Sequence, residues 1–160
     1  MAYPEAMKEG TFLVTHADEG SAVLRDVTDG QVHTLADNPG VEVGVVVEAA
    51  IEPEPPMEVA WTVAELRDRR TIPVERSAEP PTRQAEEIAA EQAVGEVTRQ
   101  ERAGDGELHV LTVPADGVED AVTDVLDDEE TVARAARLGV ARVEVRAGDD
   151  GVVSVRYLPD

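Results

Sequence analysis

The sequence predicts an α+β protein in two parts. Residues 10–66 are expected to form a small five-stranded antiparallel β-barrel, and residues 82–160 a C-terminal layer of order αβααββ that holds a three-stranded sheet. Three observations support this prediction. Short runs that alternate apolar and polar residues, separated by turn residues, fill the first half. Helical periodicity appears only in the second half. Between them lies the Arg- and Pro-rich stretch 67–81, which is expected to be a linker.

Five strand-like runs define the expected barrel. They lie at residues 11–16, 21–27, 31–36, 43–51 and 57–66, and the polar residues 1–9 are expected to be disordered. The dipeptide Asp29-Gly30 is typical of a two-residue type I′ hairpin loop. That loop would place Asp26 opposite His33 and Leu24 opposite Leu35. Trp61, the only tryptophan, is expected to plug the barrel.

The second half begins with an expected helix that runs from Pro81 or Thr82 to about Arg102. A strand at 108–113 ends at a proline, and apolar spacing of i, i+3, i+4 and i+7 predicts a helix that begins at Asp116. A second short helix is expected at 131–138. A final hairpin pairs 140–147 with 152–158, and all helices are expected on one face of the sheet.

The charge balance is strongly acidic. The chain has 35 acidic and 14 basic residues, a net charge of −21, and Lys8 is its only lysine. Self-repulsion at this charge destabilises a compact chain in dilute buffer, and molar salt screens it. We therefore expect a cytoplasmic protein of a halophilic archaeon that accumulates salt. In such an organism most proteins are acidic, so the net charge does not argue against a nucleic-acid partner.

Several chemistries are excluded or disfavoured by the sequence. Without cysteine there is no disulfide, thiolate nucleophile or Cys-based metal site. No run approaches the ~20 apolar residues of a membrane helix, and the N-terminus, where Met7 could be an alternative start, has no secretory signal. Phosphate-binding and dinucleotide-binding glycine motifs and the Gly-x-Ser-x-Gly elbow are absent.

The three histidines do not have metal-ligand spacing. His16 and His33 lie near Asp18 and Asp26 and could in principle hold a divalent ion, but no HxH, HxxxH or HExxH pattern is present. We interpret His16, His33 and His109 as strand residues. No catalytic, cofactor-binding or metal-binding residue is therefore expected.

Two resemblances are carried by particular segments. GTFLVTHADEGSAVLRDVTDGQVHTL, with NPGVEVG and EPEPPMEVAW, resembles a haloarchaeal family of uncharacterised proteins, which implies no activity and no catalytic residues. The turn from Pro39 to Gly44 makes the first half similar to small oligonucleotide-binding barrels of the OB and TRAM types. This second resemblance implies binding of nucleic acid, although the exposed aromatic residues that such barrels use are missing.

Three functional hypotheses follow. The leading one is a non-catalytic intracellular binding or adaptor module whose target is an unknown protein or a nucleic acid. The alternative is an RNA- or single-stranded-DNA-associated barrel protein that uses the cluster from Arg67 to Arg83, with contacts at Arg67, Arg69, Arg70 and Arg76. The third is an enzyme with a site between the two halves, and the missing motifs make it the weakest. The oligomeric state is left open.

Overall fold

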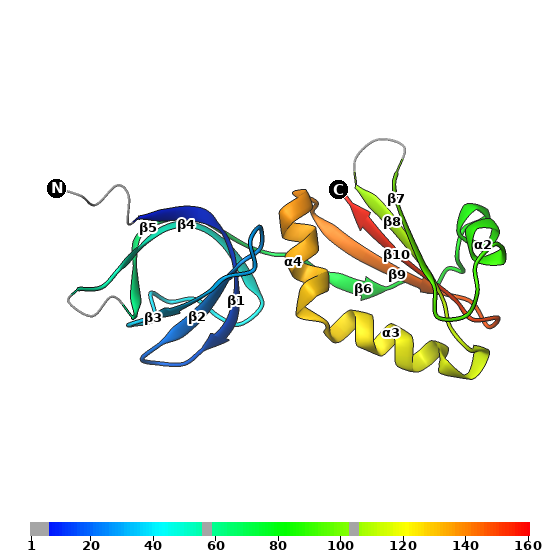
Figure 1. Ribbon diagram of the computed structural model, residues 1–160, viewed down its shortest axis with the longest axis horizontal. Helices are drawn as coiled ribbons and strands as arrows, with labels where there is room; N and C mark the ends of the chain where they lie inside the picture. The colour runs from blue at the N-terminus through cyan, green and yellow to red at the C-terminus, as the bar shows by residue number, and fades with distance from the viewer. Residues whose placement is uncertain (1–6, 56–58, 103–105) are drawn as a thin grey trace. The chain divides into compact units, whose positions relative to one another are not determined.

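The computed structural model describes residues 7–55, 59–102 and 106–160 (Figure 1). The protein is mixed α+β, and strands dominate. The chain divides into two compact units. The first comprises Met1–Ile72 with Val132–Arg137, and the second Pro73–Thr131 with Leu138–Asp160. Within the described ranges no helix is long and apolar enough to cross a membrane.

The first unit contains a sheet of five strands that closes on itself in the order β1-β2-β3-β5-β4. The strands are β1 (Lys8–Ala17), β2 (Ala22–Asp26), β3 (Val32–Leu35), β4 (Val45–Pro53) and β5 (Trp61–Thr71). Four junctions are antiparallel, but β3 and β5 run parallel where Leu35 pairs with Trp61. The prediction of a wholly antiparallel ring is therefore wrong. An odd number of strands cannot alternate direction all the way around a closed ring, so one junction has to be parallel.

The ring encloses an apolar core. Its buried members are Phe12, Val14, Ala22, Leu24, Leu35, Val41, Val47, Ala49 and Ile51. Trp61 is only partly buried and packs at the margin of this cluster, whereas Phe12 is 0% exposed. Phe12, rather than Trp61, is the aromatic residue that fills the ring.

The β2–β3 hairpin is longer than predicted. Leu24 pairs with His33, so the register differs by two residues from the expected Asp26–His33 pairing. Asp26 Oδ1 accepts hydrogen bonds from the amides of Thr28 (2.7 Å) and Asp29 (3.2 Å), and Gly30 adopts a φ of 78°. The aspartate thus builds a wider turn than the type I′ loop. A shift of two residues keeps every side chain on its predicted face, which is why the apolar pattern could not detect it.

Most of the expected linker 67–81 is strand. Residues 67–71 complete β5, which pairs with β4 as far as Val45–Thr71, and β6 (Val74–Arg76) belongs to the second sheet. The prediction was wrong because an antiparallel strand with one solvated face tolerates a run of charged residues. Strand five was expected to begin at residue 57, and residues 57 and 58 lie outside the described ranges.

The second unit is built on a sheet of five strands, not three, in the order β6-β9-β10-β8-β7. The additional members are β6 and β7 (Val97–Glu101), beside β8 (Glu107–Thr112), β9 (Arg142–Ala147) and β10 (Val152–Leu158). The predicted helix 82–102 was too long. Helix α2 (Arg83–Ala90) begins after Thr82, whose hydroxyl accepts from the Ala85 amide, and the chain turns at Gly95, with a φ of 93°.

Two helices cover opposite faces of this sheet. Helix α2 packs Ala85 and Ala89 against a cluster that includes Val152 of β10. Helix α3 (Val118–Asp127), which follows the short η1 (Ala115–Gly117), packs against a cluster that includes Val153. Neighbouring strand residues point to opposite faces, so the expectation of helices on one face is wrong. Helix α4 (Glu129–Leu138) follows α3.

Candidate functional site

The arginines that the sequence suggested as contacts belong to different elements of the two units. Arg67, Arg69 and Arg70 lie in β5 of the first unit, whereas Arg76 lies in β6 of the second unit and Arg83 begins α2. The expected continuous cluster is thus divided between two sheets and a helix. Its role in binding nucleic acid stays a prediction.

Three of these arginines have acidic or backbone partners. Arg67 pairs with Glu9 and Glu65, and Arg76 donates two hydrogen bonds to the carboxylate of Glu119, at 2.7 and 2.9 Å. The Arg76 guanidinium lowers the pKa of Glu119 by hydrogen bonding and by its charge. Arg69 donates to the carbonyl of Gly40 at 3.1 Å. The local role of these side chains is to tie strands to neighbouring segments.

A different set of polar side chains gathers on the face of the second sheet that α2 partly covers. Strand register places Gln100 (β7), Leu108 (β8), Arg156 (β10) and Glu144 (β9) in one row across four strands. Arg102 lies two residues beyond Gln100, opposite Gly106, whose carbonyl accepts a hydrogen bond from the Arg102 amide at 3.1 Å. Because alternate strand residues share a face, all of these side chains point to the α2 side.

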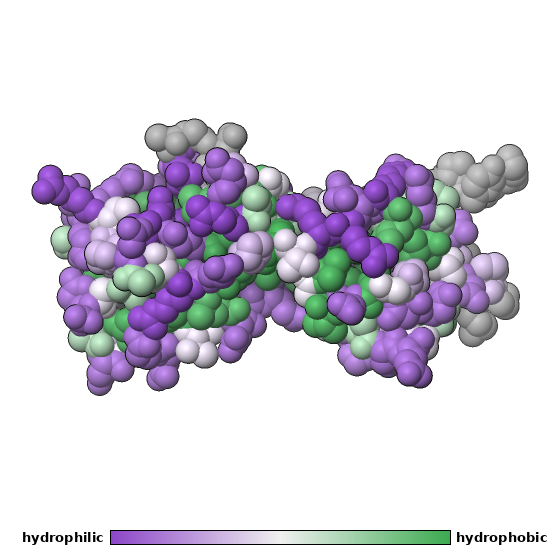
Figure 2. Space-filling view, turned by 180° about the vertical axis from the view of Figure 1, so that it is seen from behind, coloured by the Kyte–Doolittle hydropathy of each residue, from purple (hydrophilic) through white to green (hydrophobic). Residues whose placement is uncertain are grey.

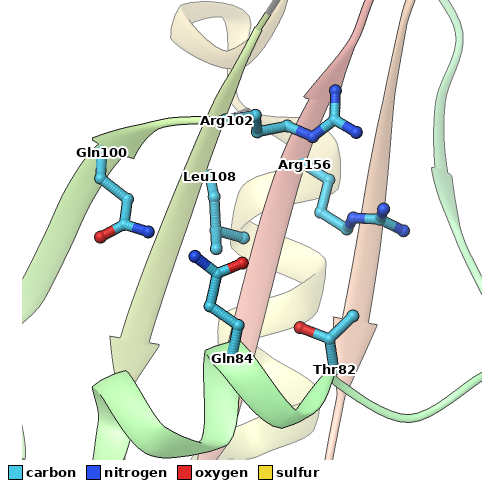
Figure 3. A pocket seen from close by; sticks show the side chains of 6 residues that line it. All are labelled: Thr82, Gln84, Gln100, Arg102, Leu108 and Arg156. Atoms are coloured by element: carbon cyan, nitrogen blue, oxygen red, sulfur yellow. The ribbon is translucent and has the colours of Figure 1, made fainter. Parts of the chain in front are cut away.

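All of these side chains except Glu144 border a pocket of about 160 Å³. Its lining residues are Thr82, Gln84, Gln100, Arg102, Leu108 and Arg156. Figure 3 shows Gln84 reaching from α2 toward Leu108, with Gln100 on one side of Leu108 and the two arginines on the other. We call this the Arg102–Arg156 pocket. It combines two guanidinium groups, two primary amides and a hydroxyl around one apolar side chain.

Three arginines gather around one carboxylate next to this pocket, and one of them, Arg146, also pairs with Glu79 at 3.0 Å. Glu144 Oε1 accepts from Arg156 and from Arg146, both at 2.7 Å, and Arg142 approaches the same carboxylate at 3.8 Å. One carboxylate therefore serves three guanidinium groups. Burial would raise the pKa of Glu144, but the hydrogen bonds from Arg146 and Arg156 outweigh burial and lower that pKa. Glu144 accordingly stays charged and holds Arg156 by a single nitrogen.

The chemistry of the pocket suits an anion. None of its six lining residues is acidic, and guanidinium groups bind carboxylates and phosphates through paired hydrogen bonds. Thr82, the N-cap of α2, brings the positive end of that helix to the pocket wall. At roughly 30 Å³ each, about five water molecules would fill the volume, which is smaller than a typical site for a drug-sized molecule. It fits one anionic group rather than a whole cofactor.

None of the three histidines lines this pocket. His16 is exposed beside Asp18 at 3.4 Å, His109 contacts Glu107 at 2.9 Å, and His33 is buried against Lys8 at 3.0 Å. The expected direct pairing of His33 with Asp26 is thus replaced by a contact with Lys8. Among the residues that the structure describes, no group of three or more histidine or acidic side chains could hold a metal ion.

Sequence reasoning missed this pocket for a physical reason. Gln84 and Gln100 were both assigned to a single helix, where sixteen residues would separate them by about 24 Å. The turn at Gly95 instead folds β7 back beside α2, and pairing with β8 and β10 brings Leu108 and Arg156 into the same row. No local motif marks residues so far apart in sequence. Gly95, inside the supposed helix, was the one available signal.

No curated protein and no solved structure matches the chain. A family model does match residues 8–147, which is most of the chain. The protein therefore belongs to the family of unknown function DUF5812.

Proposed function

We propose that the protein is a non-catalytic binding module whose second unit captures an anionic group in the Arg102–Arg156 pocket. One observation carries this proposal. In a chain with 35 acidic and 14 basic residues, two arginines, two glutamines and a threonine border a pocket that no carboxylate of the described residues lines. Two guanidinium groups with amide and hydroxyl donors around one small volume are the side chains that an anion needs, and this composition favours an anionic ligand.

Recognition would combine charge with directed hydrogen bonds. Arg156 is already oriented by Glu144, which reduces the entropy lost when its remaining N–H groups bind a ligand. The two glutamine amides can donate to an oxyanion or bond to the group that carries it. The acidic surface repels anions at long range, and salt at molar concentration screens that repulsion without removing contacts at hydrogen-bond distance.

The test is a titration with inorganic phosphate and, in parallel, acetate, in molar KCl, followed by calorimetry. Arg156→Gln and Arg102→Gln should each weaken binding about tenfold or more, because a hydrogen bond to a charged group contributes about 1.5–3 kcal/mol. Arg83→Gln removes the same charge from an exposed position that does not line the pocket, and it should bind like the wild type. Absence of binding for both anions, or equal weakening in all three variants, would contradict the proposal.

A second candidate function, association with RNA or single-stranded DNA, is supported by the first unit. Its closed ring of five strands is of the kind used by oligonucleotide-binding barrels. Under this hypothesis Arg67→Gln combined with Arg70→Gln in β5 should reduce retention of a labelled single strand, and the pocket variants should not. If the wild type, the β5 variant and the pocket variants all retain the labelled strand equally, the ring does not bind nucleic acid through β5.

A further inference from the structure

Strand β7 is an edge strand, and no described strand pairs with its outer side. It ends the order β6-β9-β10-β8-β7, so only one of its sides pairs within the sheet. The Thr112 amide donates to the Glu96 carbonyl and the Arg102 amide to the Gly106 carbonyl, both at 3.1 Å. Bonding alternates along an antiparallel ladder, so residues 96, 98, 100 and 102 bond toward β8. The N–H and C=O groups of Val97, Arg99 and Glu101 therefore lie in the plane of the sheet and point to the side of β7 that is away from β8.

The side chains on this edge alternate in a self-complementary way. Val97, Arg99 and Glu101 are all exposed, and Val97 retains 41% of its accessible surface. A second antiparallel strand bonds to β7 by placing its own outward-pointing residues opposite residues of this set. A second copy of the same strand offers the same three residues in reverse order, and the register decides which of them meet.

Few registers join two copies of β7, and charge distinguishes them. Pairing residue 99 with its own equivalent sets two arginines opposite each other, and pairing residue 101 with its own equivalent does the same for two glutamates. Pairing Arg99 with Val97 of the second copy leaves Glu101 without an opposite charge. Only the register that sets Arg99 opposite Glu101 of the second copy forms two opposite-charge pairs, one on each side of the two-fold axis.

We propose that two copies of this chain associate through antiparallel pairing of their β7 strands, with Arg99 of each copy facing Glu101 of the other. The pairing joins the two five-stranded sheets into one continuous sheet. At its centre each Gln100 faces its own equivalent, and Gln100 also lines the Arg102–Arg156 pocket. Association therefore brings two pockets side by side on one face of the joined sheet.

Net charge makes this association dependent on salt. Each copy carries a net charge of −21, so two copies repel in dilute buffer. At molar salt the Debye length is about 3 Å, and the long-range repulsion is lost while directly facing groups and backbone hydrogen bonds remain. The dimer should thus become more stable as the salt concentration rises. An interface held by long-range charge attraction would instead become weaker.

Charge reversal at the two positions tests the register. Sedimentation velocity in molar KCl, at submillimolar protein, should show a dimer for the wild type. Arg99→Glu sets Glu against Glu101 and Glu101→Arg sets Arg99 against Arg, so each variant should dissociate about tenfold more readily. An equimolar mixture of these two variants should form a heterodimer, because every facing pair is again of opposite charge. Circular dichroism checks that each variant is folded.

The outcomes separate clearly. A monomeric wild type under these conditions overturns the proposal. A dimer that both single variants retain unchanged also overturns it, since the copies would then meet through another surface. Monomeric single variants whose mixture also stays monomeric would refute the register. Restoration in the mixture, or in the double variant that carries both reversals on one chain, supports it.

Discussion

Lys8 shows how one residue organises the end of the ring in the first unit. Its ammonium lies 2.8 Å from Asp29 Oδ2, 3.3 Å from Asp26 Oδ2 and 3.0 Å from His33 Nε2. Because an ammonium can only donate, Nε2 of His33 accepts, and the imidazole is neutral with its proton on Nδ1. The His33 ring also meets Trp61 edge-on, at a centroid distance of 4.6 Å. The sequence led us to expect the Asp26–His33 neighbourhood, but it did not show that the only lysine joins the two.

The state of His33 predicts how stability depends on pH. Burial lowers the pKa of His33, and the Lys8 charge lowers it further. The unfolded chain, with a histidine pKa of about 6.5, therefore binds a proton at higher pH than the folded chain does. Stability should be complete above about pH 6.5 and fall as the pH drops from there toward the pKa of folded His33.

Urea unfolding between about pH 7.5 and pH 5.5 measures this loss. His33→Asn should flatten the pH dependence in that window, whereas His16→Asn, at an exposed position, should leave it intact. A wild-type profile that is flat, or that rises toward acid pH, would show that His33 is not held neutral by Lys8.

At the scale of elements, alternation and turn residues predicted most of the first-unit strands, α3, α4 and the β9–β10 hairpin correctly. The errors lie where a partner distant in sequence decides the structure. The Arg-rich end of β5 is a strand because β4 pairs with it as far as Thr71. Strand β7 is only five residues long and exists because it pairs with β8. Neither partner is visible in the local pattern that was read as linker or helix.

Gly151, in the β9–β10 turn, gives an element-scale prediction. Its φ is 97°, and a Cβ at this position would lie 2.2 Å from the carbonyl oxygen of Val113. The Val113 amide donates a hydrogen bond to the Gly151 carbonyl at 2.8 Å. Gly151→Ala should lower the free energy of unfolding by about 2 kcal/mol or more, through strain at positive φ and displacement of Val113. A Cβ at Gly20 would meet no atom within 4 Å, so Gly20→Ala should change the free energy of unfolding by less than about 0.5 kcal/mol. Similar denaturation midpoints for the two variants would contradict this reading of the turn.

At the scale of the whole chain, charge dominates. Figure 2 shows hydrophilic residues over most of the visible surface of each unit, with smaller apolar patches among these residues. Composition predicted a hydrophilic surface, but it could not predict that three arginines meet at Glu144, because that arrangement depends on strand register. The site was missed for the same reason as β7, since its side chains come from segments that only the folded sheet brings together.

The net charge of −21 also predicts a salt requirement. Below about 0.5 M salt, weaker screening should let self-repulsion unfold the chain. Circular dichroism during dialysis from molar KCl into dilute buffer follows this transition, and sucrose at matched viscosity controls for solvent effects other than screening. A spectrum that stays unchanged in dilute buffer would show that the chain tolerates its charge without screening.

An NMR titration of the folded protein with inorganic phosphate in molar KCl tests directly whether the Arg102–Arg156 pocket binds an anion. We expect saturable shifts of the side-chain amide signals of Gln84 and Gln100 and of the Arg156 Nε–H signal, and no such shifts in Arg156→Gln. Shifts that are absent, that do not saturate, or that appear at Arg67 and Arg70 of β5 instead would contradict the proposal.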